Sequence, residues 1–292
     1  MIISHIIGGL GNQMFQYAAA RALSLRRGQP LYLDVSEFAG YDLHHGFELD
    51  RVFNCPAAIA TRAEMAGVLG WQSFRRVRRA MARPSMARWR RDELIVEPCF
   101  QYWEGIDRAP QDCYLMGYWQ SDRYFQDCAD TIRAEFAFQS PLAGRNAQLA
   151  RQMDDVNAVS LHVRRGDYAN NPKAASTHGL CPPDYYREAV QLMAARIARP
   201  HLFIFSDDMV WVKENLKFEL PCEFVEHNRG TESYNDMRLM SLCKHHIIAN
   251  SSFSWWGAWL NPDPGKIVVA PQRWFAKQID TRDLLPKDWV RL

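Results

Sequence analysis

Two adjacent arginines follow an apolar run of the sequence and could bind an anion. Arg164 and Arg165 come directly after residues 158–163, whose small and branched side chains are typical of a buried strand. Loops at the carboxyl ends of strands are the usual ligand positions of open α/β sheets. A guanidinium stays charged and offers a planar fork of donors that matches phosphate oxygens. The alternative is that Arg165 and Asp167 only form an ion pair on a surface turn.

A glycine-rich turn near the start of the sequence is a second candidate anion site. It joins a predicted strand at residues 2–7 to a predicted helix at 13–27, where glycines let backbone amides approach a ligand. One interpretation is a dinucleotide-binding loop, since Asp34 stands where a ribose-binding acid would follow, but Met14 replaces the third glycine of that fingerprint. The other is a tight turn that only packs a strand on a helix. The candidate ligands are Gly9, Gly11, Asn12 and Gln13.

A third cluster of polar residues precedes a short predicted helix at 254–260. Hydroxyls and amides at a helix start favour a phosphate-sized anion. These residues are Asn250, Ser251, Ser252 and Phe253. Asp236 could accept hydrogen bonds from a nucleotide, or it could only compensate the dipole in the first turn of its own helix. Asp207 and Asp208 follow another predicted strand, and we expect one of them to cap the next helix.

Aromatic residues of the same short helix have two interpretations. Tryptophans at helical spacing usually belong to a core, but they can also form a platform for the apolar face of a sugar. These residues are Trp255, Trp256 and Trp259.

The composition excludes several classes of protein. With 48% hydrophobic and 23% charged residues among 292, the chain has enough apolar material for real cores. A net charge of +2 argues against a nucleic-acid partner. The seven cysteines lack metal-ligand spacing and are interpreted as buried thiols of a reducing compartment. Without a signal peptide or a run of about 18 apolar residues, we expect a cytoplasmic protein.

The elements that must position these residues alternate as strands and helices in two halves. Residues 2–34 form a βαβ unit, and helices are expected at 61–89 and 122–138 around a strand at 113–118. Residues 139–146 are the best candidate linker. In the second half, strands are expected at 158–163, 201–205, 246–249 and 266–270, with helices at 183–198, 233–244 and 254–260.

Four motifs, taken together and in order, resemble the bacterial and animal α-1,2-fucosyltransferases of glycosyltransferase family 11. They are GGLGNQMFQYA at 8–18, HVRRGDY at 162–168, FSDD at 205–208 and ANSSFSWWGAWLN at 249–261. The resemblance implies an α/β fold of GT-B type, with two Rossmann-like domains facing a central cleft. The acceptor side with the glycine loop would be domain 1–145, and domain 146–292 would bind GDP-fucose.

The activity that the resemblance implies is an inverting transfer of L-fucose from GDP-fucose to the 2-hydroxyl of a terminal galactose, without a metal or other cofactor. The partners are then GDP-fucose and a galactose-terminated oligosaccharide acceptor. Animal members carry an N-terminal membrane anchor that this sequence lacks, so a bacterial enzyme of oligosaccharide or O-antigen synthesis is expected. The alternatives are another fucosyltransferase, acting on protein or forming α-1,6 linkages, and a non-catalytic nucleotide-sugar-binding protein.

Related α-1,6- and protein O-fucosyltransferases suggest roles for matching residues. Their GN matches Gly11 and Asn12, their HxR matches His162 and Arg164, their aspartate matches Asp236, and their serine-aromatic pair matches Ser252 and Phe253. In those relatives the arginine holds the β-phosphate, which makes Arg164 the expected catalytic cation. Asp167 is the first candidate for a general base and His162 the second, although some relatives lack an obvious base. The expected donor-binding residues are Gly9, Gly11, Asn12, Gln13, His162, Arg164, Arg165, Asp207, Asp236, Asn250, Ser251, Ser252 and Phe253.

Arginines are concentrated in one predicted helical stretch. They are Arg75, Arg76, Arg78, Arg79, Arg83, Arg88, Arg90 and Arg91, flanked by Trp71, Phe74 and Trp89. One interpretation is a solvated helix face. The other is peripheral docking on an anionic inner membrane, where lipid-linked glycans are assembled.

Overall fold

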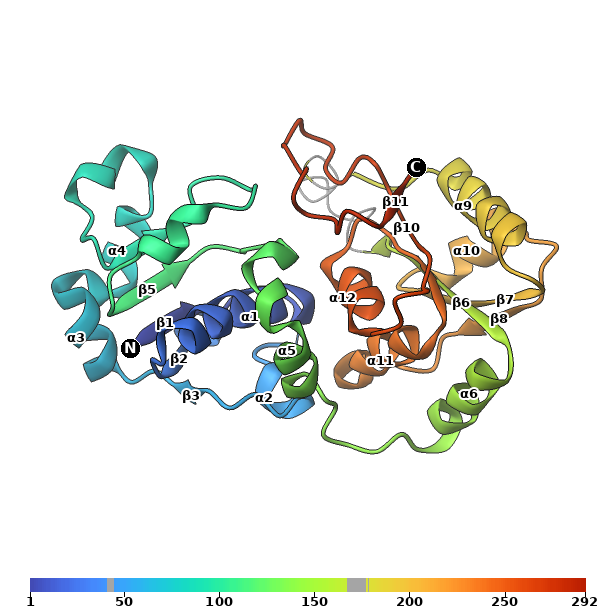
Figure 1. Ribbon diagram of the computed structural model, residues 1–292, viewed down its shortest axis with the longest axis horizontal. Helices are drawn as coiled ribbons and strands as arrows, with labels where there is room; N and C mark the ends of the chain where they lie inside the picture. Colours follow the sequence, from blue (N-terminus) through green and yellow to red (C-terminus); the bar gives the residue numbers. More distant parts are fainter. Residues whose placement is uncertain (41–44, 167–176, 178) are drawn as a thin grey trace. The chain divides into compact units, whose positions relative to one another are not determined.

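The computed structural model describes residues 1–40, 45–166, 177 and 179–292, which form two compact units (Figure 1). Unit 1 comprises Met1–Gln139 with Asp280–Leu284, and unit 2 comprises Ser140–Ile279 with Leu285–Leu292. The chain passes from one unit to the other after Gln139, within the segment expected to be a linker.

A short late segment belongs to unit 1, which departs from the expected contiguous domains 1–145 and 146–292. Asp283 explains the departure, because its carboxylate accepts hydrogen bonds from the Arg123 side chain at 2.9 Å and from the backbone N–H of Tyr102 at 3.2 Å. Two polar contacts therefore fasten this segment to residues far away in the sequence.

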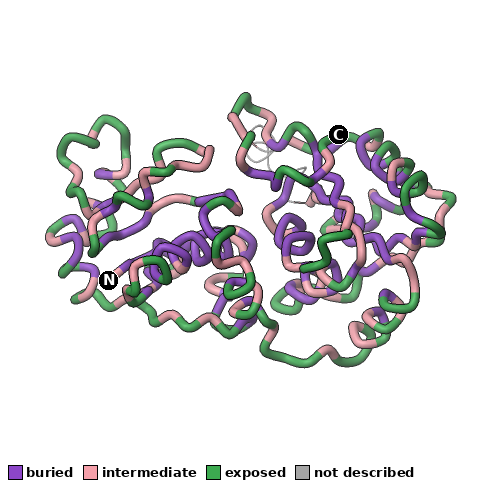
Figure 2. The backbone as a smooth tube through the Cα atoms, viewed as in Figure 1, coloured by how far each residue is buried: buried purple, intermediate pink, exposed green. Residues whose placement is uncertain are grey.

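Unit 1 is built on a five-stranded sheet in which every pairing is parallel, in the order β3-β2-β1-β5-β4. Its strands are β1 (Ile2–His5), β2 (Leu31–Asp34), β3 (Ala58–Ile59), β4 (Leu94–Val96) and β5 (Cys113–Met116). The central strands are buried (Figure 2), as expected for parallel strands that helices cover. Strands β3 and β4 were not predicted.

The helices of unit 1 are interrupted more often than the sequence pattern suggested. They are α1 (Leu10–Arg27), α2 (Leu49–Val52), α3 (Arg62–Leu69), α4 (Arg75–Met81) and α5 (Ala129–Glu135). The helix expected over 61–89 breaks at Gly70, where φ is +55°, and again before Pro84. The helix expected over 122–138 is reduced to two 3₁₀ turns followed by α5.

Unit 2 contains a six-stranded sheet, again with only parallel pairings, in the order β11-β10-β9-β6-β7-β8. Its strands are β6 (Asn157–Val163), β7 (Pro200–Ser206), β8 (Cys222–Val225), β9 (His245–Ile247), β10 (Val268–Ala270) and β11 (Val290–Arg291). Strand β6 pairs with β9 on one side and β7 on the other. The carboxyl ends of these three strands therefore meet at one edge of the sheet.

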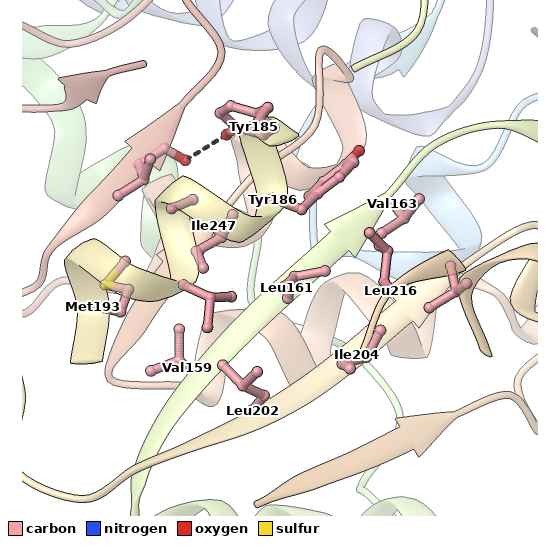
Figure 3. Close-up of a cluster of buried hydrophobic side chains, with 14 of the residues drawn as sticks. Val159, Leu161, Val163, Tyr185, Tyr186, Met193, Leu202, Ile204, Leu216 and Ile247 are labelled. Carbon is pink, nitrogen blue, oxygen red and sulfur yellow. Dashed lines mark hydrogen bonds between the residues drawn. The ribbon is translucent and has the colours of Figure 1, made fainter. Parts of the chain in front are cut away.

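The helices of unit 2 pack on this sheet through apolar faces. Those in the described residues are α6 (Gly144–Asp155), α9 (Pro183–Arg196), α10 (Met209–Asn215), α11 (Tyr234–Leu242) and α12 (Ser252–Leu260). Figure 3 shows Leu161 of β6 and Leu202 of β7 in one buried cluster with Tyr186 and Met193 of α9. Helices α11 and α12 approach closely, because a Cβ on Gly257 would lie 2.9 Å from the Cβ of Met240.

The three tryptophans of α12 are core residues, so the sugar-platform interpretation was wrong. Trp255, Trp256 and Trp259 are all buried, and Trp255 lies against Trp289 with ring centroids 5.5 Å apart. The cysteines are less uniform than expected. Cys113, Cys181 and Cys243 are buried, whereas Cys99 is exposed. Among the described residues, no helix combines the length and apolar character needed to cross a bilayer.

Candidate active site

Arg164 and Asp207 meet at the carboxyl edge of the unit 2 sheet. The parallel register pairs Val163 with Ser206, so the next residue of each strand continues into the same region. The Nη1 atom of Arg164 lies 3.0 Å from Oδ2 of Asp207, and the backbone N–H of Arg165 donates to Oδ1 of Asp207 at 2.8 Å. Both charged side chains remain 24% exposed. A cation held in place at a solvent-accessible edge is suited to binding an anion.

Asp207 is ionised in this arrangement. Burial alone would raise its pKa, but the Arg164 guanidinium and the backbone N–H groups of Arg165 and Gly166 bring the pKa below its ordinary value. Gly166 also leaves room for the carboxylate, since a Cβ there would lie 3.0 Å from Oδ2 of Asp207. The sequence placed Asp207 among the donor-binding residues, which stays a prediction, and the structure adds a contact with Arg164.

Arg165 is directed toward a different neighbour. Its guanidinium lies over the Trp211 ring, 3.8 Å from the centroid, and its Nε is 3.6 Å from Oδ2 of Asp208. Asp208 in turn caps α10 by accepting the Trp211 backbone N–H at 3.2 Å, which confirms the expected helix-capping acid. Arg165 therefore has packing partners of its own, and Arg164 is the better placed of the two for a phosphate.

His162 is a buried, neutral imidazole beside these charges. Burial lowers its pKa to about 4, an effect that Asp207 opposes and Arg164 reinforces. Its ring centroid is 6.0 Å from that of Phe253, and its Nδ1 has no hydrogen-bond partner among the described residues. Because of its low pKa, His162 is a weak base at neutral pH. Asp167, the first candidate for a base, lies outside the described residues.

The amino end of α12 lies beside the same edge, as the Phe253 contact with His162 shows. Ser251 is the N-cap, and its hydroxyl accepts the Phe253 backbone N–H at 3.3 Å. Ser252 and Phe253 in the first turn are partly exposed, so the helix begins where an anion can approach it. Asn250 is different: it is buried, donates to the Trp274 carbonyl at 3.1 Å and accepts from the Cys181 thiol at 3.4 Å. These contacts give Asn250 a structural role.

Asp236 lies in the first turn of α11, the helix that packs against α12. Its Oδ1 accepts a hydrogen bond from Asn228 at 2.8 Å, and the Asn228 amide is also paired with that of Asn146. Burial raises the pKa of Asp236 to about 7, although the Asn228 contact lowers it. Burial thus favours the protonated form of this carboxyl group, which lies in a polar network, beyond the dipole-compensating role considered from sequence alone.

The glycine turn of unit 1 is shorter than expected. Helix α1 already begins at Leu10 with Gly9 as its N-cap, so Gly11, Asn12 and Gln13 form its first turn. The Gln13 amide donates to the carbonyls of Gly8 at 2.9 Å and Gly46 at 2.8 Å, and it accepts the Glu48 N–H at 3.0 Å. We therefore assign Gln13 to the structure of the turn. Asn12 accepts a hydrogen bond from Gln120 at 2.7 Å.

Asp34 does not provide a ribose-binding acid. It is buried with Arg78, whose Nη2 is 2.7 Å from Oδ2, and the Tyr114 hydroxyl donates to the same oxygen. Burial raises its pKa, but Arg78 and hydrogen bonds bring the pKa below the ordinary value. This result removes the dinucleotide-binding interpretation. It also shows that Arg78 does not belong to a solvated helix face.

Glu97 is a candidate that the sequence reasoning missed. It follows β4, and its carboxylate accepts the backbone N–H groups of Tyr118 at 2.6 Å and Trp119 at 3.0 Å. Burial raises its pKa to about 7, although both hydrogen bonds lower it. The sequence shows only an acidic residue after a short apolar run, and the three residues of β4 are too few to show the alternation of a strand. In the described part of the chain, no three His, Cys, Asp or Glu side chains are grouped to hold a metal.

The chain has two parallel-sheet units, and an arginine and a helix start lie together at the carboxyl edge of one sheet, an arrangement of GT-B type. The crystal structure of the NodZ α-1,6-fucosyltransferase of Bradyrhizobium, soaked with GDP-fucose, has a TM-score of 0.53 to this chain. The similarity covers 89% of this chain and 92% of NodZ at 16% identity, and it shows the fold alone. The chain belongs to glycosyl transferase family 11, whose model matches residues 106–292.

Relatives of known activity differ in the sugar that their names specify. An α-1,2-colitosyltransferase of Escherichia coli is 36% identical over 100% of this chain and 99% of its own. The O-antigen biosynthesis glycosyltransferase WbnK of Escherichia coli is 33% identical over 99% of both. Galactoside α-(1,2)-fucosyltransferase 1 of Alouatta caraya is 25% identical over 87% of this chain and 63% of its own length.

Proposed function

We propose that this glycosyltransferase transfers L-fucose from GDP-fucose to the 2-hydroxyl of a terminal galactose in an O-antigen oligosaccharide. The observation that carries the proposal is Arg164, held by Asp207 beside the amino end of α12. The α-1,2 linkage is supported by the names of two relatives, and the O-antigen acceptor by the name of a third.

The chemistry follows from the charge that develops in the transition state. As the bond between fucose C1 and the β-phosphate oxygen breaks, negative charge grows on the phosphate and the galactose 2-hydroxyl oxygen bonds to C1. A fixed guanidinium at that phosphate stabilises the transition state more than the ground state. Arg164 would supply the charge, with backbone N–H groups at Ser252 assisting. Attack opposite the leaving GDP inverts the β-linked donor into an α-linked product.

The proton of the attacking hydroxyl needs an acceptor. Asp167 remains our first candidate and His162 the second, but a pKa of about 4 leaves His162 a poor base at neutral pH. If neither acts, the hydroxyl loses its proton late in a dissociative transition state. Asp236 would accept hydrogen bonds from the ribose or base of GDP.

A second candidate donor is GDP-colitose, because a relative with 36% identity over the whole chain is an α-1,2-colitosyltransferase. Colitose is fucose without its 3-hydroxyl group. The two donors therefore share their diphosphate chemistry, and Arg164 would serve both. A site that hydrogen-bonds the 3-hydroxyl would discriminate strongly against the sugar that lacks it.

Release of GDP tests the proposal. The purified protein is mixed with one donor, GDP-fucose or GDP-colitose, and one acceptor: lactose, N-acetyllactosamine or a Gal-β1,3-linked disaccharide. EDTA is present throughout, because Arg164 is expected to supply the positive charge that a metal would otherwise bring to the phosphate. We expect rapid release only with GDP-fucose plus a galactoside, and none when the galactose lacks its 2-hydroxyl. Faster release from GDP-colitose would select the second candidate. Binding of GDP without turnover would mean a non-catalytic protein, and restoration by manganese would refute metal independence.

A further inference from the structure

Glu97 and Tyr118 lie at the carboxyl edge of the unit 1 sheet, where β4 and β5 end side by side. The register pairs Val96 with Met116, and the Glu97 N–H continues the ladder by donating to the Met116 carbonyl at 2.9 Å. The next residue, Gly117, permits the carboxylate to fold over the end of β5, since a Cβ there would lie 2.4 Å from the Cβ of Glu97. Ligands of parallel α/β sheets bind at this edge.

The backbone after Gly117 is held in an unusual conformation. Trp119 has φ of +54°, which is a true outlier for a bulky residue, and its side chain is completely buried. This conformation directs the N–H groups of Tyr118 and Trp119 to the two oxygens of one carboxylate. Each oxygen has a second lone pair for another donor. The strained turn thus fixes Glu97 as a hydrogen-bond acceptor that is only partly covered.

Aromatic groups and a cavity accompany the carboxylate. Tyr118 is 45% exposed. Leu94 and Val96 pack into the core with Ile3. Because side chains of a strand alternate between its two faces, Glu97 lies on the opposite face, together with Ile95. Ile95 lines an open cavity of about 780 Å³. The rest of its wall in unit 1 includes Tyr102, Trp103, Arg108 and Arg123.

Packing links the turn to this cavity. The Trp119 ring meets Tyr124 edge-on at 5.6 Å, and the Tyr124 hydroxyl accepts the Trp103 backbone N–H at 2.9 Å. A carboxyl group that can accept hydrogen bonds, an exposed aromatic ring and a cavity with aromatic and arginine walls match the hydroxyls and apolar faces of an oligosaccharide.

We propose that Glu97 and Tyr118 bind the acceptor oligosaccharide. Glu97 accepts a hydrogen bond from a hydroxyl of the terminal galactose, and the Tyr118 ring covers the apolar face of a sugar ring. The following sugars of the acceptor occupy the cavity lined by Tyr102 and Trp103. This inference rests on the proposed function, because it takes a galactoside as the acceptor. It gives unit 1 a ligand-binding role separate from the donor chemistry of unit 2.

Saturation-transfer NMR with lactose in the presence of GDP tests the inference without requiring turnover. We compare wild type with Glu97→Gln, Glu97→Asp, Tyr118→Ala and Tyr118→Phe. Glu97→Gln and Tyr118→Ala should weaken lactose binding at least tenfold and raise the acceptor KM correspondingly, while GDP binding stays unchanged. Tyr118→Phe, which keeps the ring, and Glu93→Gln, an acid near β4 paired with Arg91, serve as matched controls.

The outcomes separate this inference from the proposed function. Loss of lactose binding in Glu97→Gln and Tyr118→Ala, with partial recovery in Glu97→Asp, supports the acceptor site. Unchanged lactose binding in folded Glu97→Gln and Tyr118→Ala overturns it even if fucose transfer is confirmed. If wild type transfers no fucose but these two variants alone lose galactoside binding, the acceptor site stands and the proposed donor is wrong.

Discussion

At the scale of single residues, the guanidinium of Arg164 is held in a fixed orientation in addition to carrying a positive charge. Asp207 contacts its Nη1 at 3.0 Å and is itself fixed by the Arg165 backbone N–H. Arginine offers several donors in one plane, whereas lysine concentrates its charge on one atom at the end of a flexible chain. A role at the β-phosphate therefore depends on the shape of the guanidinium, and this dependence can be tested without removing the charge.

Arg164→Lys should lower kcat by about a hundredfold or more, because one oriented transition-state contact of this kind is typically worth that much. The measurement is steady-state GDP release with GDP-fucose and lactose. GDP affinity should fall less than kcat, since the contact strengthens as charge develops.

Arg187→Lys is the matched control, because Arg187 is an exposed arginine that pairs with Asp184 in the same unit. It should retain wild-type kinetics. A folded Arg164→Lys protein that also turns over at the wild-type rate would remove Arg164 from the proposed role.

At the scale of elements, long apolar runs were predictable and pairings were not. The run that became β6 and the helices α9, α11 and α12 were expected from their composition and period, with ends that moved by a few residues. Short strands were predicted unevenly: β9 and β10 were expected, whereas β3 and β8 were missed because their few residues carry little apolar pattern.

The candidate site shows the same limit. Arg164 and Asp207 were each singled out by residue type, but their contact depends on β6 pairing in register with β7, which one sequence does not reveal. Glu97 was missed because its position depends on the register of β4 with β5 and on the conformation of Trp119. Asn250 and Gln13 stay predicted donor-binding residues, and the structure adds protein partners for both amides that the sequence does not reveal, because buried and exposed amides have the same sequence signature.

At the scale of the whole molecule, positive charge is unevenly distributed. The chain has a net charge of +2, yet residues 70–91 contain eight arginines and no acid. Trp71, Phe74 and Trp89 in this segment are 59%, 70% and 62% exposed. The buried Gln72 amide donates to the Trp89 carbonyl at 2.8 Å, so the stretch that carries Trp71 lies beside the stretch that carries Trp89.

We propose that this segment of unit 1 docks on an anionic membrane surface, with the aromatic side chains at the headgroup level. Not every arginine contributes: Arg78 is buried with Asp34, and Arg79 and Arg91 pair with Glu37 and Glu93. The exposed Arg75, Arg76, Arg83 and Arg88 are the arginines most available to lipid, although the Nε of Arg75 also lies 4.0 Å from Oε2 of Glu37.

Vesicle sedimentation measures this docking. Changing Arg75, Arg76, Arg83 and Arg88 together to glutamine should abolish binding to phosphatidylglycerol vesicles at low salt. Wild type should be released by high salt and should ignore phosphatidylcholine. A control with glutamine at the exposed Arg187, Arg196, Arg199 and Arg229 has the same charge change and should still bind. Equal sedimentation of all three proteins would refute the membrane role of this segment.

The central claim, transfer of fucose to a galactose 2-hydroxyl, is tested most directly by the linkage in the product. The protein is incubated with GDP-fucose and lactose, and the isolated trisaccharide is examined by NMR. We expect an α-configured fucose and a glycosylation shift at C2 of the galactose, with no other carbon of that ring newly glycosylated. A fucose attached at another position, a β-configured fucose, or free fucose as the sole product would contradict it.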